Sequence, residues 1–304
     1  MRNYAHARGL GDRTAGETDQ MTSDEVPASD GDVGIAGRPG PLPFDTSVAH
    51  QARIYNYVLG GKDNYAADRA AAEAWMRVYP QLTFDMRANR AFLGRLVRYL
   101  AGEAGIRQFL DIGTGIPAAG NTHEIAQEVA PESRVVYVDY DPVVLAHARA
   151  LLTSHAAGAT EYIDADLRDT GTILDRARQV LDFTKPVAIT LLAILHAVPE
   201  ADDPYAVVKT LLDAVPSGSY LALSHLAADR LTSETKGALS DVAERMVQQQ
   251  ITYRNREQIA RFFEGTDLVE PGIVPVEDWR PDPGAAAPGH SSVWCAVGRK
   301  APRD

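Results

Sequence analysis

The sequence contains 304 residues, of which 45% are hydrophobic, and its formal net charge is −11. The length fits one large α/β domain with appendages. The acidic charge argues against a nucleic-acid or anionic-membrane surface, because such a surface needs a basic face. A single cysteine excludes an internal disulfide, and no run of about 18 apolar residues is available to cross a membrane. The N-terminus lacks an apolar signal core, so we expect a cytoplasmic protein.

The first 100 residues divide into a tail and a group of helices. Residues 1–43 are rich in Gly, Asp, Ser, Thr and Pro without apolar periodicity, which predicts a disordered tail. Apolar residues then recur at helical spacing in three stretches: from Thr46 or Ser47 to residue 59, from about residue 63 to 78, and from about 84 to 102. Their apolar faces must pack, so we expect a cap across the carboxyl ends of the strands that follow.

A Gly-Gly pair at residues 60–61 separates the first two predicted helices. Two interpretations stay open. The pair can stop one helix so that the next restarts. Alternatively, it can act as the hinge of a lid, with Lys62, Asn64 and Tyr65 supplying polar contacts to a ligand beneath.

A short apolar strand at residues 108–112 leads directly into a turn that contains Gly113, Thr114 and Gly115. A strand, a Gly-x-Gly turn and a helix form the cradle in which α/β folds hold nucleotide-like ligands. The spacing also satisfies a dinucleotide fingerprint. However, Asp111 precedes the first glycine by two positions, where it would repel a pyrophosphate and attract an ammonium or sulfonium group. This favours S-adenosylmethionine over NAD; an ordinary turn with a solvated Asp111 is the structural alternative.

Acidic residues also follow the second and third predicted strands. Asp139 ends the strand at residues 135–139, about 20 residues beyond the turn, where a carboxylate can accept both hydrogen bonds of a ribose diol. Asp141, which precedes a proline, is predicted to cap the next helix. After the strand at 160–163, Asp166 can accept a hydrogen bond from a purine amine, or it can cap a helix.

The remaining strands alternate with helices, which predicts a mainly parallel sheet covered on both faces. Strands are expected at residues 187–192 and 220–224. Two further stretches, 268–279 and 291–297, alternate like strands and are predicted to form an antiparallel closing pair.

This arrangement resembles class I S-adenosylmethionine-dependent methyltransferases, whose α/β Rossmann-like sheet has seven strands and ends in an antiparallel hairpin. Four segments resemble, more narrowly, the actinobacterial S-adenosyl methyltransferase family, formerly a domain of unknown function: ARIYNYVLGGKDNYAADR at 52–69, DIGTGIP at 111–117, VDYDPVVL at 138–145 and ADLRD at 165–169. The resemblance covers about residues 44–300.

The resemblance implies roles for individual residues at the cofactor site. The backbone of the glycine turn would approach the ligand, and Asp111 would face the methionine ammonium. Asp139 would bind the ribose, Tyr140 would pack on the adenine, and Asp166 with the Leu167 amide would bind the adenine edge.

Three further side chains are weaker candidates. His196 and His225 follow the fourth and fifth strands on the side where ligands bind, so either is a candidate general base, with a structural histidine as the alternative. Arg90, on the third predicted helix, would neutralise the methionine carboxylate or be solvated. No cluster has the spacing of a zinc site, so no metal is predicted.

The sequence therefore predicts an S-adenosylmethionine-dependent methyltransferase with a helical cap at 44–104 and a catalytic domain at 105–304. The cap would enclose the acceptor, which favours a small molecule and neither a nucleic acid nor a membrane. Two alternatives remain: a protein that binds the cofactor without transferring methyl, and an NAD-dependent oxidoreductase, which Asp111 disfavours.

Overall fold

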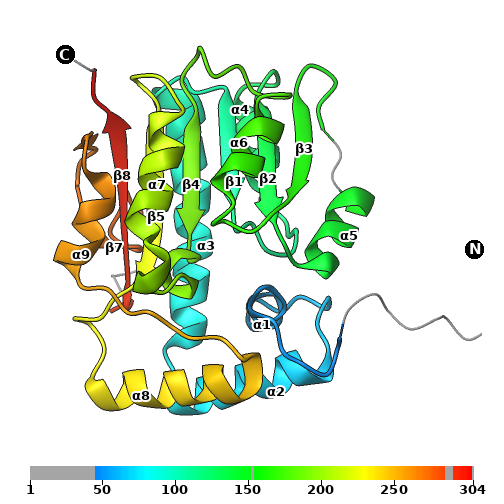
Figure 1. Cartoon of the computed structure of the whole chain (residues 1–304), viewed down its shortest axis with the longest axis vertical. Coiled ribbons are helices and arrows are strands. Elements are labelled where there is room, and N and C mark those ends of the chain that lie inside the picture. The colour runs from blue at the N-terminus through cyan, green and yellow to red at the C-terminus, as the bar shows by residue number, and fades with distance from the viewer. Residues whose placement is uncertain (1–44, 152–153, 285–289, 303–304) are drawn as a thin grey trace, which may run out of the picture. The chain divides into compact units, whose positions relative to one another are not determined.

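An eight-stranded sheet has the strand order β3-β2-β1-β4-β5-β8-β6, with β7 paired to β8 (Figure 1). The computed structural model describes residues 45–151, 154–284 and 290–302, so the tail expected at 1–43 lies outside the described residues. The strands are β1 (Gln108–Ile112), β2 (Arg134–Asp139), β3 (Ala159–Asp164), β4 (Ala188–Leu192), β5 (Tyr220–Leu226), β6 (Thr266–Leu268), β7 (Val274–Pro275) and β8 (Val293–Lys300). Strands β1 to β5 pair in parallel, and β8 pairs antiparallel with β5, β6 and β7. The predicted parallel sheet with an antiparallel end is confirmed.

The stretch expected to form one strand at 268–279 instead forms two short strands, which is why eight strands are present rather than seven. A turn between β6 and β7 separates them, and the Gly272 amide donates to the Val269 carbonyl at 2.9 Å. Pro271 has no N–H to donate to a strand ladder, and Gly272 has a φ of +83°. The ladder is therefore interrupted at this point.

Nine α-helices occur in the described residues: α1 (Gln51–Val58), α2 (Ala66–Val78), α3 (Leu82–Arg98), α4 (Thr122–Val129), α5 (Pro142–Leu151), α6 (Thr170–Ala177), α7 (Pro204–Asp213), α8 (Ser233–Val242) and α9 (Arg256–Ala260). Helix α1 begins later than predicted, because Asp45 accepts both the amide and the hydroxyl of Ser47 and holds that segment outside the helix. His50 caps α1 instead.

The two faces of the sheet are covered by different helices (Figure 1). Because side chains alternate along a strand, Leu110 and Ile112 of β1 point to one face, where they pack in a cluster with α6, α7 and α9. Phe109 points to the other face, where Phe92 and Leu96 of α3 complete a second cluster. Asp111 shares the parity of Phe109, so its side chain is directed to the α3 face.

Helices α1 and α2 lie at the carboxyl ends of the parallel strands, where α8 joins them (Figure 1). Their apolar side chains form one cluster, and Trp75 of α2 donates its indole N–H to the Leu239 carbonyl of α8 at 3.0 Å. The expectation that all three N-terminal helices lie across the strand ends is wrong for α3, which packs along the sheet. The cap is instead α1, α2 and α8, and it draws on the C-terminal half of the chain. In the part of the chain described, no helix is both long and apolar enough to span a membrane.

Candidate functional site

The glycine turn at the end of β1 has a backbone that only glycine accommodates. Gly113 has a φ of +77°, and its amide donates to the Val138 carbonyl at 2.8 Å. A Cβ at this position would lie 2.5 Å from Cγ1 of Ile194, in the loop after β4. Glycine is therefore required both by the left-handed conformation and by the close approach of the neighbouring loop.

Asp111 lies buried beneath this turn. Its two carboxylate oxygens accept hydrogen bonds from the hydroxyls of Thr122, at 2.6 Å, and Thr190, at 2.7 Å. Burial raises the pKa of Asp111, whereas the two hydroxyls and the charge of Arg90 act in the opposite direction. Asp111 is therefore not the solvated aspartate of an ordinary turn.

Asp139, at the end of β2, has fewer unoccupied acceptor positions than the sequence suggested. One carboxylate oxygen accepts the Gly115 amide at 2.9 Å, and the other accepts the amides of Tyr140 and Asp141 at 2.8 and 3.0 Å. A carboxylate offers about four acceptor positions, so one remains. Asp139 thus holds the glycine turn against β2 and keeps room for about one further donor.

The loops at the strand ends and the cap line a partly open cavity of about 960 Å³. It extends from the glycine turn to helices α2 and α8, since Gly113, Trp75 and Leu239 all line it. Ten of the residues singled out from the sequence line this cavity: Gly60, Gly61, Arg90, Asp111, Gly113, Thr114, Gly115, Asp139, Tyr140 and His196. The structure therefore brings together the acids of β1 and β2, the turn and one histidine.

Lys62, Asn64 and Tyr65 do not line the cavity. The Asn64 side-chain amide donates to the Asn56 side chain at 2.9 Å, and the Tyr65 backbone amide donates to the Asp68 carboxylate at 2.8 Å. Both hydrogen bonds order the connection between α1 and α2. Lys62 is exposed. These contacts fit the stop-and-restart interpretation for the three side chains, whereas Gly60 and Gly61 themselves line the cavity.

Asp166 and Leu167 also lie outside the cavity lining. The Asp166 carboxylate accepts three hydrogen bonds from the backbone and guanidinium of Arg168, and Leu167 is buried in the sheet core. The helix-cap alternative belongs to Asp169, which accepts the Thr172 amide at 3.0 Å and caps α6. By the count used for Asp139, the Asp166 carboxylate keeps about one acceptor position, but it lies outside the cavity lining.

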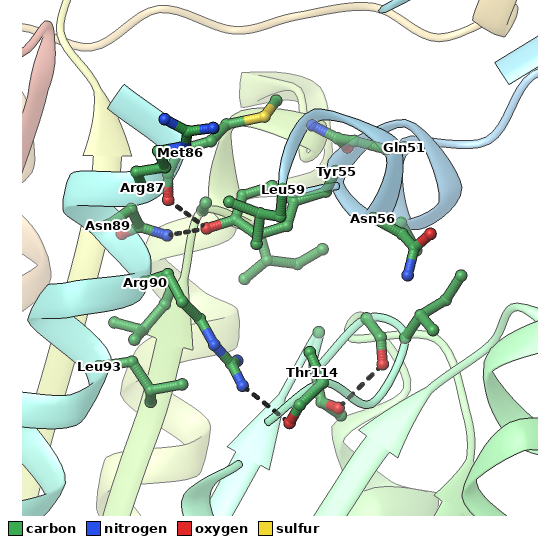
Figure 2. Close-up of a pocket in the computed structure, with 18 of the residues that line it drawn as sticks. Gln51, Tyr55, Asn56, Leu59, Met86, Arg87, Asn89, Arg90, Leu93 and Thr114 are labelled. Carbon is green, nitrogen blue, oxygen red and sulfur yellow. Dashed lines mark hydrogen bonds between the residues drawn. The ribbon is translucent and has the colours of Figure 1, made fainter. Parts of the chain in front are cut away.

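Arg90 lines the cavity from α3 and points toward the glycine turn (Figure 2). Its guanidinium donates to the carbonyls of Ala118 and Ala119 at 3.2 and 3.0 Å, and to the Asn121 side chain at 3.2 Å. Arg90 is therefore neither solvated nor free. It fixes the far end of the turn and places a positive charge near Asp111.

His196 follows β4 and is the histidine candidate that reaches the cavity. Its Nε2 hydrogen-bonds the Gln51 side chain of α1, and its Nδ1 is buried without a partner among the described residues. Burial, with a smaller contribution from the charge of Arg254, lowers the pKa of His196 to about 4. The imidazole is therefore neutral near pH 7, with Nε2 accepting from the Gln51 amide and the proton on Nδ1.

His225 is placed differently from His196. It is fully buried, with Nδ1 2.8 Å from the Leu226 carbonyl and Nε2 2.8 Å from the Arg254 guanidinium. Burial lowers its pKa well below the usual value. Both ring nitrogens are occupied, so His225 has the structural role that the sequence left open.

Several cavity residues were not predicted from the sequence. Figure 2 shows Tyr55 of α1 reaching α3, where its hydroxyl donates to the Met86 carbonyl at 2.8 Å and accepts from Asn89 at 3.3 Å. Asn89 in turn accepts from Ser224 of β5 at 2.6 Å. This network ties the cap to the sheet. In the sequence, it could have been inferred only from polar residues on otherwise apolar helical faces.

Helix α1 is also tied to the loop after β2. His50 Nδ1 lies 2.6 Å from an oxygen of Asp141, and Arg53 Nε lies 3.7 Å from the same oxygen. Asp141 accepts the Val143 amide at 2.6 Å, which confirms the predicted cap. These contacts hold α1 over the glycine turn.

No group of metal-ligating side chains occurs among the residues that the structure describes.

Comparisons with known proteins give a matching family model and similar solved structures. A family model described as S-adenosyl methyltransferase matches residues 39–301. A DUF574 family protein from Streptomyces avermitilis is 48% identical, with a TM-score of 0.80 and coverage of 84% of this chain and 99% of that chain. A putative methyltransferase from Thermobifida fusca is 42% identical, with a TM-score of 0.76 and coverage of 84% and 97%. A search of curated proteins gives no match.

Proposed function

The chain belongs to the S-adenosyl methyltransferase family, and from this premise we propose that it methylates a small-molecule acceptor held between the glycine turn and the helical cap. Membership makes S-adenosylmethionine, rather than NAD, the cofactor. When bound, this cofactor supplies a methyl group on a positively charged sulfur. One observation carries the acceptor proposal: a single cavity contacts both the glycine turn and the cap.

The residues around the turn fit the charged groups of the cofactor. Buried Asp111 would attract the ammonium of the methionine part, and Arg90 would attract its carboxylate. Asp139 would accept one ribose hydroxyl at its remaining position, and half-exposed Tyr140 would offer a ring to the adenine. The left-handed glycines let the backbone approach the ligand closely.

The size of the cavity supports a small acceptor. Ligand pockets commonly measure about 300–1,000 Å³, so a cavity of about 960 Å³ is large enough for the cofactor and a second, smaller ligand. The cap covers the end of the cavity that the glycine turn does not use. Bringing acceptor and methyl donor together in one cavity can lower the activation barrier by several kcal/mol.

His196 is the residue that we propose to accept a proton from the acceptor. It lies in the loop after β4, three residues from Ala193, whose amide is held by Ser224 at 2.9 Å. In the neutral imidazole Nε2 accepts from the Gln51 amide and the proton is on Nδ1, so Nε2 is the nitrogen that can take a proton, from an oxygen or nitrogen nucleophile that displaces the Gln51 amide. The Gln51 contact orients the ring.

Labelled cofactor tests the proposal directly. The full chain is incubated with methyl-labelled S-adenosylmethionine and a panel of small phenols, amines and carboxylic acids, and label transfer is measured. We expect transfer to at least one class, and His196→Gln should lower kcat while leaving S-adenosylhomocysteine affinity unchanged. His290→Gln, at an exposed position, is the matched control.

The outcomes separate the alternatives. Cofactor binding without transfer to any of the panel would support the non-catalytic binding protein. Failure to bind S-adenosylhomocysteine would instead remove the cofactor-site assignment itself.

A further inference from the structure

The cap end of the cavity is a chamber of mainly apolar and aromatic side chains. It is lined by Trp75, Tyr79, Leu82, Met86, Leu239 and Ile251. Both aromatic residues are held in place, because the Trp75 indole donates to Leu239 and the Tyr79 hydroxyl donates to Asp85. A rigid aromatic chamber of this kind suits an apolar ligand, and aromatic faces also attract cations.

One carboxylate, Asp85 of α3, forms part of the chamber wall. Its residue is only 3% exposed. It accepts the Tyr79 hydroxyl at 2.8 Å and the Ser292 amide at 3.3 Å, and the Ser291 side chain also acts on it as a hydrogen-bond donor; all three donors are neutral. None of the ion pairs within residues 45–151, 154–284 and 290–302 includes Asp85.

The other acids that line the cavity differ from Asp85. Thr122 and Thr190 occupy both oxygens of Asp111, and three amides occupy Asp139. The remaining one, Asp282, is exposed and lies 3.6 Å from Arg98. Asp85 is therefore the buried cavity acid with the longest hydrogen bond, 3.3 Å from the Ser292 amide.

The charges around Asp85 do not compensate it. Glu277, from the segment after β7, adds negative potential, and its Oε2 is buried without a hydrogen-bond partner among the described residues. Arg230 acts on Tyr79 but donates to the Ser291 carbonyl. Of the three α3 arginines that line the cavity, Arg90 is bonded to the turn, Arg98 lies 3.6 Å from Asp282, and Arg87 is exposed.

A buried carboxylate without a cationic partner is unfavourable, because Asp is seldom buried unless it is paired. Burial accordingly raises the pKa of Asp85 to about 6, so the group is mostly ionised at pH 7 while lacking a counter-charge. The first turn of α3 favours the anion only partly. A cation arriving in the chamber would supply the missing partner.

We propose that the acceptor is a small apolar molecule carrying an ammonium group, which pairs with Asp85 while its apolar body fills the aromatic chamber. That the bound amine is the molecule methylated rests on the proposed function. That the chamber binds an amine does not depend on catalysis. The chamber is continuous with the glycine turn, so an amine anchored at Asp85 extends toward His196 and the methyl donor.

The test compares two probes of the same shape, 2-phenylethylamine and 2-phenylethanol. Their affinities for the full chain are measured by ligand-observed NMR, with and without S-adenosylhomocysteine. We expect the amine to bind about tenfold tighter or more, as for a hydrogen-bonded charge pair in a buried site. Asp85→Asn should abolish this preference, and Asp282→Asn, which removes an exposed acid from the same cavity, should retain it.

A second measurement uses the unaltered chain, so it does not depend on the folding of a variant. Amine affinity should fall as the pH decreases from 7 to 5, because Asp85 becomes protonated, while alcohol affinity stays constant. Equal binding of both probes at pH 7, or an amine preference that survives Asp85→Asn, would overturn the proposal. Cofactor affinity is read separately in the same samples, so a failure of the proposed function is distinguishable.

Discussion

The Arg254 guanidinium lies 2.8 Å from Nε2 of His225, and both side chains are fully buried. The same guanidinium donates to the carbonyls of Leu195 and Val198, at 2.9 and 3.0 Å, on either side of His196. Its charge is balanced by Glu200 at 2.8 Å. Arg254 therefore links β5 to the loop that carries His196 and fixes where that imidazole faces the cavity.

Replacing Arg254 should destabilise the fold and displace His196. Arg254→Met leaves the buried His225 and two carbonyls without their donor, and we expect a loss of about 2–4 kcal/mol, because unsatisfied buried acceptors are costly; Glu200 is half exposed and adds little. Arg254→Lys keeps the charge without the planar fork and should lose less. Arg178→Lys, in an exposed pair with Asp175, should change stability by under about 0.5 kcal/mol. Urea unfolding measures all three, and equal losses at Arg254 and Arg178 would contradict the assignment.

A methyl group at Gly113 should damage the turn. Gly113→Ala places a Cβ 2.5 Å from Ile194 and forces alanine into a left-handed conformation, so we expect a loss of about 2 kcal/mol or more. Gly237→Ala is the matched control, because it lies inside α8 with no atom within 4 Å of the new methyl group. That change should stabilise the protein by about 0.5–1 kcal/mol. Thermal unfolding of the two variants gives opposite signs if the turn is as described.

Asp139 and Asp141 should have different functions despite their proximity. Asp139→Ala leaves the Gly115 amide without its acceptor and would remove the proposed ribose contact, so S-adenosylhomocysteine binding should weaken by about 1.5–3 kcal/mol. Asp141→Ala removes the Val143 cap and the contact with His50, and should mainly reduce stability, by about 1–2 kcal/mol. Calorimetry and thermal unfolding on both variants separate the roles. A stronger effect of Asp141→Ala on binding would mean that the two acids are assigned in reverse.

Asp85 should make stability depend on pH in a predictable direction. Burial raises its pKa from the ordinary 3.8 to about 6, so the folded state holds the proton more tightly than the unfolded state. The associated stabilisation is complete below about pH 4 and is lost as the pH rises through about 6. The Asp85→Asn variant has no titrating group at this position, so it does not lose this stabilisation. Its free energy of unfolding relative to wild type should therefore rise by up to about 3 kcal/mol between pH 4 and 7. Urea unfolding at several pH values measures the difference, and a pH-independent difference would exclude this role for Asp85.

Some features follow from the sequence because they depend on neighbours along the chain. The strands from β1 to β5, the glycine turn after Ile112 and the cap at Asp141 are all local patterns of periodicity, φ preference and side-chain-to-backbone bonding. The placement of Asp111 and Asp139 at one sheet edge also follows, since parallel strands end at the same edge. The resemblance to the methyltransferase family rests on these local motifs.

Tertiary structure decided the rest, because it depends on partners far apart in sequence. Periodicity predicts an apolar face on α3 but not the surface it meets, and Phe92 and Leu96 pack on the sheet rather than in the cap. Likewise, His196 and His225 follow strands in the same way. Only their distant contacts, with Gln51 and Arg254, leave one histidine facing the cavity and make the other a buried structural group. A residue's role is fixed by which polar groups and charges surround it after burial, and these surroundings are assembled only when the chain folds.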